Sequence, residues 1–151
     1  MTSMKIDLRA LTDFGEQLED VNKQKEKERK QFIRKQGTEL RRRTVREARA
    51  SVGKKAVSRR RYTRRAGQYH KSIKRGRYYK YRDDSDCIRV YSPDKIAHLI
   101  ELGFVPVLRN HSRGPKVAGK NVFEKAGKSF ESTFAKACDE FVVGYKGAIE
   151  K

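Results

Sequence analysis

Apolar residues near the N-terminus recur every three or four positions, a spacing that predicts an amphipathic helix. Asp7 is the expected N-cap, and the helix should run to about residue 21, with an apolar stripe formed by Leu8, Leu11, Phe14 and Leu18. A second, longer helix is predicted over residues 22–50, where Lys, Glu, Arg and Gln dominate. Residues 23–34 are polar nearly all round, so this part either stands off the core or is covered by a neighbouring subunit.

The middle of the chain changes from helical to strand-like patterns. Residues 51–65 are expected to form a loop that begins near Gly53 and has too few apolar residues to pack. A short turn of helix is expected within residues 66–73. Two strands should follow at residues 74–82 and 86–91, because the polar residues 83–85 between them suit a hairpin turn.

The C-terminal third has two helix starts. Ser92, Pro93 and Asp94 form a strong N-terminal signal for a helix that Gly103 should stop. Residues 104–119 are expected to be a long loop, although residues 105–108 could pair as a strand. Asn121 and Glu124 have the spacing of a capping box for the last helix. The apolar stripe of that helix is the clearest in the chain and makes it the candidate central core helix: Phe123, Ala126, Phe130, Phe134, Ala137, Phe141 and Tyr145.

These elements predict a single α+β domain over residues 1–151. Long N-terminal helices and a long C-terminal helix should pack on a small, mostly antiparallel sheet, with a short helix between strands. Residues 53–65 would be a basic, flexible arm or loop. Hydrophobic residues make up 36% of the chain and charged residues 38%, so the core is modest and stability should depend on joining other subunits.

The charge of the chain points to an anionic partner. The formal net charge is +19, and residues 54–82 hold thirteen basic residues without one acid. Nucleic acid is the commonest partner for such a segment, an acidic protein surface is the next, and a merely solvated loop is the third interpretation. Contact with phosphates or with an acidic partner is expected from seven residues: Lys54, Lys55, Arg59, Arg60, Arg61, Arg64 and Arg65.

The same segment holds five tyrosines, which can stack on bases or pack in a core: Tyr62, Tyr69, Tyr78, Tyr79 and Tyr81.

The residue spacings give little support to metal binding, catalysis or cofactor binding. His70, His98 and His111 lie far apart and away from the cysteines, so no metal site is expected. Nucleotide-binding and hydrolase motifs are absent, and we expect neither catalysis nor a cofactor. Cys87 and Cys138 should be reduced thiols. We expect no signal peptide and no membrane span, and hence a protein made in a cytoplasm.

Three short elements, taken in order, resemble those of one family. Residues 65–73, with Gly67, Ser72 and Ile73, resemble a Thr-Gly-x-Leu-x-x-Ser-Ile element. Residues 96–103 resemble a Tyr-Ala-x-x-x-Glu-Phe-Gly element, and residues 117–126 resemble the opening of a final helix. Together they resemble the tail-completion, or neck, proteins of long-tailed bacteriophages. The chain departs from that pattern at Ala66 and Tyr69, where the family has Thr and Leu, and at residues 102–104, where Leu-Gly-Phe replaces Phe-Gly-Thr.

The resemblance implies a structural virion protein, assembled in the host bacterial cytoplasm and located in the virion at the end of the tail. Such a tail-completion or tail-terminator subunit forms a homo-oligomeric ring, usually a hexamer, between the tail tube protein and a head-side connector or head-closure protein, with phage DNA in the lumen. Subunit contacts would then involve Glu101, Phe104, Arg109, Arg113 and Lys116. The alternative is a non-viral, basic nucleic-acid-binding module, and a nuclease is a third, weaker one.

Overall fold

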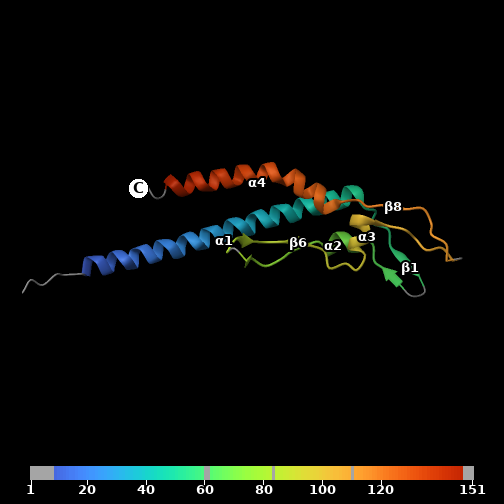
Figure 1. The fold of residues 1–151 in the computed structure, drawn as a ribbon, viewed down its shortest axis with the longest axis horizontal. Helices are drawn as coiled ribbons and strands as arrows, with labels where there is room; N and C mark the ends of the chain where they lie inside the picture. Colours follow the sequence, from blue (N-terminus) through green and yellow to red (C-terminus); the bar gives the residue numbers. More distant parts are fainter. Residues whose placement is uncertain (1–8, 60–61, 83, 110, 148–151) are drawn as a thin grey trace, which may run out of the picture.

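The computed structural model describes residues 9–59, 62–82, 84–109 and 111–147. Two long helices, α1 (Arg9–Ser51) and α4 (Val122–Gly147), run antiparallel and approach each other toward the C-terminal end of α1 (Figure 1). Short helices α2 (Gln68–Ser72) and α3 (Ala97–Leu102) and the paired strands of residues 74–91 lie along the other side of α1, whereas the remaining strand pairs lie beyond its C-terminal end. The fold class is therefore α+β with antiparallel strand pairs, as predicted.

A single helix replaces the two that the N-terminal pattern predicted. The apolar stripe is interrupted near Asn22, but Asn22 is not a helix breaker, so the helix continues through this position. Side-chain pairs spaced four residues apart support this part of α1: Lys23 Nζ lies 3.7 Å from Glu19 Oε2, and Lys30 Nζ lies 2.6 Å from Glu26 Oε1. With 43 residues the helix is about 65 Å long.

The hairpin predicted over residues 74–91 is confirmed, with an interrupted ladder. Strand β3 (Lys74–Arg75) pairs with β6 (Val90–Tyr91), and β4 (Tyr79–Lys80) pairs with β5 (Asp86–Cys87). Between the two pairs, the Gly76 N–H donates to the carbonyl of Arg89 at 2.8 Å. The turn is closed where the Tyr81 N–H donates to the carbonyl of Ser85 at 3.0 Å.

Both segments expected to be loops contain strands. Strand β1 (Val57–Arg59) pairs with β2 (Tyr62–Arg64) inside the predicted arm. Strand β7 (Gly103–Phe104) pairs with β8 (Val117–Ala118), and a bridge between Val107 and Arg113 extends this ladder toward its tip. Gly103 has φ +80°, and a Cβ there would lie 2.3 Å from the carbonyl oxygen of Val117, so only glycine fits at the start of β7.

The helix expected after residue 92 starts later than predicted, whereas the last helix starts directly after Asn121 as predicted but without the expected capping box. Helix α3 begins at Ala97 because side chains capture the preceding backbone N–H groups: Ser92 Oγ accepts from Asp94 N at 3.3 Å, and Asp94 Oδ1 accepts from Ile96 N at 3.1 Å. The expected capping box of α4 is absent within the described residues, because the Glu124 carboxylate accepts a bond from Lys128 Nζ at 2.7 Å instead.

The core is small and centres on α1. Four buried residues form it, Ala48 of α1, Tyr69 and Ile73 around α2, and Val122 of α4. Helix α1 contacts α4, α2, β3, β5 and β6, so α1, and not α4 as predicted, is the central element. Among the stripe residues of α4 whose side chains the structure describes, only Ala126 and Phe130 are buried. Farther along, Phe134 and Phe141 stack on Phe32 with ring centroids 6.4 and 4.5 Å away.

Much of the molecule is exposed. The chain has an accessible surface of 12815 Å², whereas a compact monomer of 17.6 kDa has about 7,900 Å². The polar stretch of α1 stands off the core, since most of its side chains between residues 18 and 31 are exposed. Among the described helices, none has an apolar stretch that could cross a membrane.

Candidate nucleic-acid interface

Among the described cations of the predicted basic arm, most are exposed without an ion pair, and one is held in an ion pair inside the protein. Lys54, Lys55 and Arg65 are exposed and have no ion pair within the described residues. Arg59 lies in β1, where its backbone is in register with Tyr62, and Arg60 and Arg61 lie outside the described residues. Arg64 differs because it is held in an internal ion pair.

The Arg64–Asp94 pair fastens the β1–β2 hairpin to the turn before α3. Arg64 Nη2 lies 3.2 Å from Asp94 Oδ2, and the two side chains are only 14% and 2% exposed. Such a buried carboxylate needs its cation, because an unpaired buried charge is costly. Arg64 is therefore committed to the fold, and its predicted contact with an outside anion would break this pair.

A basic groove lies between α1 and the segment of α2 and β3, and the sequence prediction missed it. Two adjoining cavities of about 580 and 380 Å³ form it. Their lining includes seven cations and no acid. We call this the arginine groove and define it by its lining cations: Arg41, Arg42, Arg46, Arg49, Lys71, Lys74 and Arg75.

Some of these cations build the walls of the groove. Arg41 Nε donates to the carbonyl of Ile73 at 2.9 Å, which joins α1 to the end of α2. Arg75 Nη1 donates to the carbonyl of Arg34 at 2.9 Å and to Thr38 Oγ1 at 3.1 Å, which joins β3 to α1. The acceptors of these bonds are uncharged carbonyl and hydroxyl oxygens, so these bonds do not neutralise the positive charges of the two guanidinium groups.

Other cations of the groove have no partner among the residues that the structure describes. Arg46, Arg49, Lys71 and Lys74 form no ion pair within the described residues, and all four are exposed. Arg42, in contrast, lies 2.9 Å from the Glu39 carboxylate. Unpaired guanidinium and ammonium groups without a nearby acid attract phosphate, and arginine can bind two phosphate oxygens at once.

Helix geometry explains why the groove is basic. Arg42, Arg46 and Arg49 follow one another at intervals of four and three residues, so they project from one face of α1. This spacing is visible in the sequence and could have indicated a basic face. That Lys71 and Lys74 lie opposite that face follows only from the packing of α2 and β3 against α1.

His70 closes the inner side of the groove. The residue is 6% exposed, and Nε2 of its ring lies 3.1 and 3.0 Å from the carbonyl oxygens of Ala48 and Val52. Nε2 must therefore carry the proton that these two acceptors share. His70 thus caps the C-terminal end of α1, since its ring binds the carbonyl of Val52, just past the helix, together with the carbonyl of Ala48, which also accepts the Val52 N–H at 2.9 Å.

Two of the five tyrosines of the basic segment, Tyr69 and Tyr78, are used by the fold. Tyr69 is 1% exposed, and the hydroxyl of Tyr78 donates to the carboxylate of Asp86. Tyr79 and Tyr81 are 41% and 56% exposed, so these two are available for stacking. Both belong to the β4–β5 hairpin and do not line the arginine groove.

The residues predicted for subunit contact occupy two different environments. Glu101 lies inside the subunit, where its carboxylate accepts bonds from the Tyr69 hydroxyl at 2.8 Å and the Phe123 N–H at 3.2 Å. The other four residues, Phe104, Arg109, Arg113 and Lys116, are exposed in the segment from β7 to β8. That segment is a surface available to a partner.

Comparisons and metal chemistry complete the description of the site. Within the described ranges, no three His, Cys, Asp or Glu side chains group as metal ligands would. Comparison with protein-family models, with curated proteins and with solved structures finds no match to this chain.

Proposed function

We propose that this protein is a structural subunit of a bacteriophage neck: a tail-completion or tail-terminator protein that forms a homo-oligomeric ring between tail tube and head around the DNA path. The observation that carries the proposal is the incomplete burial of the single chain. Its accessible surface exceeds that of a compact monomer by more than half. A chain that leaves so much surface uncovered is typical of a subunit that completes its core in an assembly.

The exposed apolar residues support this proposal because they gather on particular elements. Val142 and Val143 are 50% and 70% exposed near the end of α4, and Leu18 and Val21 are each 48% exposed on α1. On the β7–β8 segment, Val107 is 70% exposed. Surfaces of this kind on an otherwise charged protein mark sites of protein association.

The arginine groove and the arm suit a position beside DNA. Their unpaired cations can bind phosphates without any geometry for reading bases, and a lumen that DNA of any sequence traverses requires that kind of contact. An acidic surface of a neighbouring neck protein is the other anion that the groove could accept. In both cases the protein has no catalytic role and needs no cofactor.

The test is assembly with the neighbours of the neck. The full chain is mixed with the tail tube protein encoded beside it, and the complex is examined by native mass spectrometry and electron microscopy. We expect a ring, hexameric by the family resemblance, at the end of the tube. A chain that stays monomeric alone, with tail tubes and with the head-side connector would overturn the proposal.

A second candidate function is a non-viral nucleic-acid-binding module, and the arginine groove is the observation that favours it. A module of this kind would bind tightly as a monomer. Titration of DNA and RNA at several salt concentrations separates the two candidates. Tight, RNA-preferring binding by a monomer supports the module, whereas weak binding by the monomer that strengthens on ring formation supports the neck protein.

A further inference from the structure

The β3–β6 strand pair has one face toward α1 and one face toward solvent. On the inner face, Arg75 donates hydrogen bonds to α1, and Val90 packs against the core. Side chains alternate across a strand, so Lys74 and Tyr91, which are partners in the β3–β6 register, belong to the outer face. Both residues are exposed, and Tyr91 is 36% exposed.

Arg89 and Tyr91 stack on each other on this outer face. The guanidinium carbon of Arg89 lies 5.0 Å from the centroid of the Tyr91 ring, which is a cation–π contact. Gly76 leaves room for the pair, because a Cβ at Gly76 would lie 3.2 Å from Arg89 Cγ and 3.7 Å from Tyr91 Cε1. Arg89 is exposed and forms no ion pair within the described residues. We call Gly76, Arg89 and Tyr91 the Tyr91 stack; it presents planar groups and a positive charge to solvent.

Lys74 connects the Tyr91 stack to the arginine groove. It lines the groove, and it lies opposite Tyr91 in the strand ladder, where facing residues have Cβ atoms about 5 Å apart. The same groove contains Lys71, Arg46 and Arg49, none of which has an ion pair within the described residues. A set of unpaired cations therefore adjoins an exposed aromatic ring.

Acidic side chains are absent from the segments around the Tyr91 stack. Residues 71–82 and 87–93 contain neither Asp nor Glu. The side chain of Asp94, which follows them, is only 2% exposed and is paired with Arg64. A polyanion that binds across the groove and the stack is therefore not repelled by a carboxylate of these segments.

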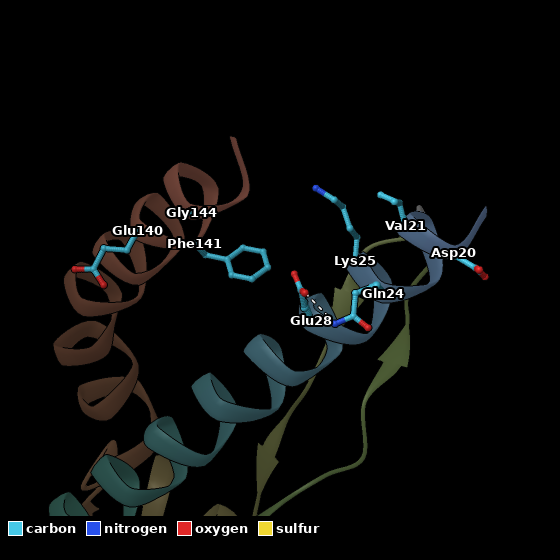
Figure 2. A pocket seen from close by; sticks show the side chains of 8 residues that line it. All are labelled: Asp20, Val21, Gln24, Lys25, Glu28, Glu140, Phe141 and Gly144. Atoms are coloured by element: carbon cyan, nitrogen blue, oxygen red, sulfur yellow. Dashed lines mark hydrogen bonds between the residues drawn. The ribbon is translucent and has the colours of Figure 1, made fainter. Parts of the chain in front are cut away.

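The cleft between the N-terminal half of α1 and the end of α4 has a different lining (Figure 2). Lys25 is the only cation among the described residues that line this cleft, and Gln24 donates to the Glu28 carboxylate there at 3.0 Å. A polyanion has no comparable set of cations at that end of the molecule. The cations that attract one lie along the arginine groove and the Tyr91 stack.

We propose that the arginine groove and the Tyr91 stack together bind a single strand of nucleic acid, with its phosphates in the groove and a base on the stack. Sites of this kind combine a positive groove for the backbone with aromatic rings for the bases, and they accept any sequence because every base has a flat face. A duplex keeps the faces of its bases covered, and an acidic protein surface matches the cations alone. The site goes beyond the neck function, because one subunit carries all of it.

Labelled probes of equal length separate the contribution of the bases from that of the charge: an oligodeoxythymidine, an oligouridine, a sugar–phosphate strand without bases, and a DNA duplex. Fluorescence anisotropy measures their binding to the full chain at rising salt concentration. We expect the oligodeoxythymidine or the oligouridine to bind about tenfold more tightly than the abasic strand, as one stacked base contributes. This ratio should persist as salt rises, because salt weakens the phosphate contacts that the strands share and leaves stacking in place.

Tyr91→Leu removes the ring and keeps an apolar side chain in the strand. It should lower the affinity for the tighter single strand about tenfold and leave the affinity for the abasic strand unchanged. Tyr81→Leu is the matched control and should bind like the wild type, because Tyr81 is a 56% exposed tyrosine of the same hairpin that does not line the groove. Circular dichroism and thermal melting verify that both variants are folded.

A second measurement keeps an aromatic side chain at this position. The chain contains no tryptophan, so Tyr91→Trp introduces a single indole whose fluorescence reports on the stack alone. A base that stacks on the indole should quench its emission, whereas the abasic strand should leave the emission nearly unchanged. Tyr81→Trp is the matched reporter and should show little quenching with either strand.

Four results would overturn the site. Equal affinities for the base-bearing and abasic strands, without quenching of the indole, would show that charge alone causes binding. Equal losses from Tyr91→Leu and Tyr81→Leu would place the bases elsewhere on the hairpin. Tighter binding of the duplex at every salt concentration would make the ligand double-stranded. Displacement of the single strand by polyglutamate more readily than by unlabelled abasic strand would make the ligand an acidic protein.

Ring formation is a separate outcome, which native mass spectrometry measures on the same protein. If rings form on tail tubes and the single strands bind no better than the abasic strand, the strand site is wrong and the neck function stands. If the Tyr91 stack binds single strands and the chain never assembles, the neck function fails and the strand site stands.

Discussion

The hydroxyl of Tyr69 donates a hydrogen bond of 2.8 Å to Oε1 of Glu101, and the other oxygen of that carboxylate accepts the N–H of Phe123 at 3.2 Å. One carboxylate on α3 thereby joins α2 to the first turn of α4. A negative charge at that position also interacts favourably with the N-terminal end of the helix dipole. Glu101 replaces the local cap that Asn121 and Glu124 were expected to supply.

Tyr69→Phe should lower the free energy of unfolding by about 1–2 kcal/mol, because it removes a hydroxyl that donates to a partly buried carboxylate. Urea denaturation followed by circular dichroism measures the change. Tyr79→Phe is the control, because Tyr79 is 41% exposed and its substitution should cost less than about 0.5 kcal/mol. Equal effects of the two substitutions would show that the Tyr69–Glu101 bond contributes nothing.

Arg64→Gln should lower the free energy of unfolding by about 3 kcal/mol, because Asp94 is left as an unpaired carboxylate that is 2% exposed. Arg65→Gln is the neighbouring control and should leave stability almost unchanged, since Arg65 is exposed. Thermal melts of the two variants measure the difference. A stable Arg64→Gln variant would contradict the structural role of this pair.

The double substitution Arg46→Gln and Arg49→Gln should weaken DNA binding and reduce the slope of log K against log salt by about 2, because two cations no longer neutralise phosphates. Binding is measured by fluorescence anisotropy of a labelled duplex at several salt concentrations. Lys125→Gln with Lys128→Gln on α4 removes the same charge outside the arginine groove. If both double variants change the slope equally, net charge alone explains binding and the groove has no special role.

Asp86 joins the β4–β5 hairpin to α1 through Arg29, and within the hairpin it also binds Tyr78 and Lys80. Partial burial raises the pKa of this carboxyl, but hydrogen bonds from Tyr78 and Lys80 and the charge of Arg29 outweigh that effect and hold the pKa below its usual value. The stabilisation is therefore fully present above the unfolded-state pKa of about 3.9 and is lost as pH falls through the lower, folded-state pKa.

Asp86→Asn should accordingly destabilise the protein at pH 7 and have a much smaller effect in strong acid, where the wild-type carboxyl is also protonated. Urea titrations of both proteins at neutral and acidic pH measure the two differences. Asp84→Asn, at a side chain that is 84% exposed, controls for the loss of a charge in the same hairpin. A destabilisation that stays constant across this range would exclude the Asp86 charge as its cause.

Local signals account for the parts of the fold that the sequence predicts well. The polar turn around Asp84 and the start of α4 after Asn121 depend on neighbouring residues, and both were placed correctly. The β7–β8 pairing was missed because it joins residues 103–104 to 117–118, and nothing near Phe104 indicates its partner. The break expected near residue 22 was wrong because a weakened apolar stripe does not end a helix when good helix formers continue it.

The candidate site, too, depends on contacts between residues far apart in the sequence, which local patterns do not predict. Composition indicated that cations gather in the middle of the chain, but it directed attention to the arm alone. The arginine groove combines residues 41–49 with residues 71–75, and only packing brings these two segments together. Arg64 was assigned to an outside partner because a sequence gives no sign that Asp94 lies beside it in the fold.

Because α1 is one continuous helix from Arg9 to Ser51, it holds its two ends at a fixed distance from each other. Each residue adds about 1.5 Å of length and about 100° of rotation, so the number of residues between the two ends sets both their separation and their relative orientation. A deletion of seven residues in the polar stretch would shorten the helix by about 10 Å and keep the side chains on either side of the deletion on the same faces. A deletion of two would turn one end of the helix to the opposite side relative to the other, so the number of residues in α1 sets how the surfaces at its two ends face.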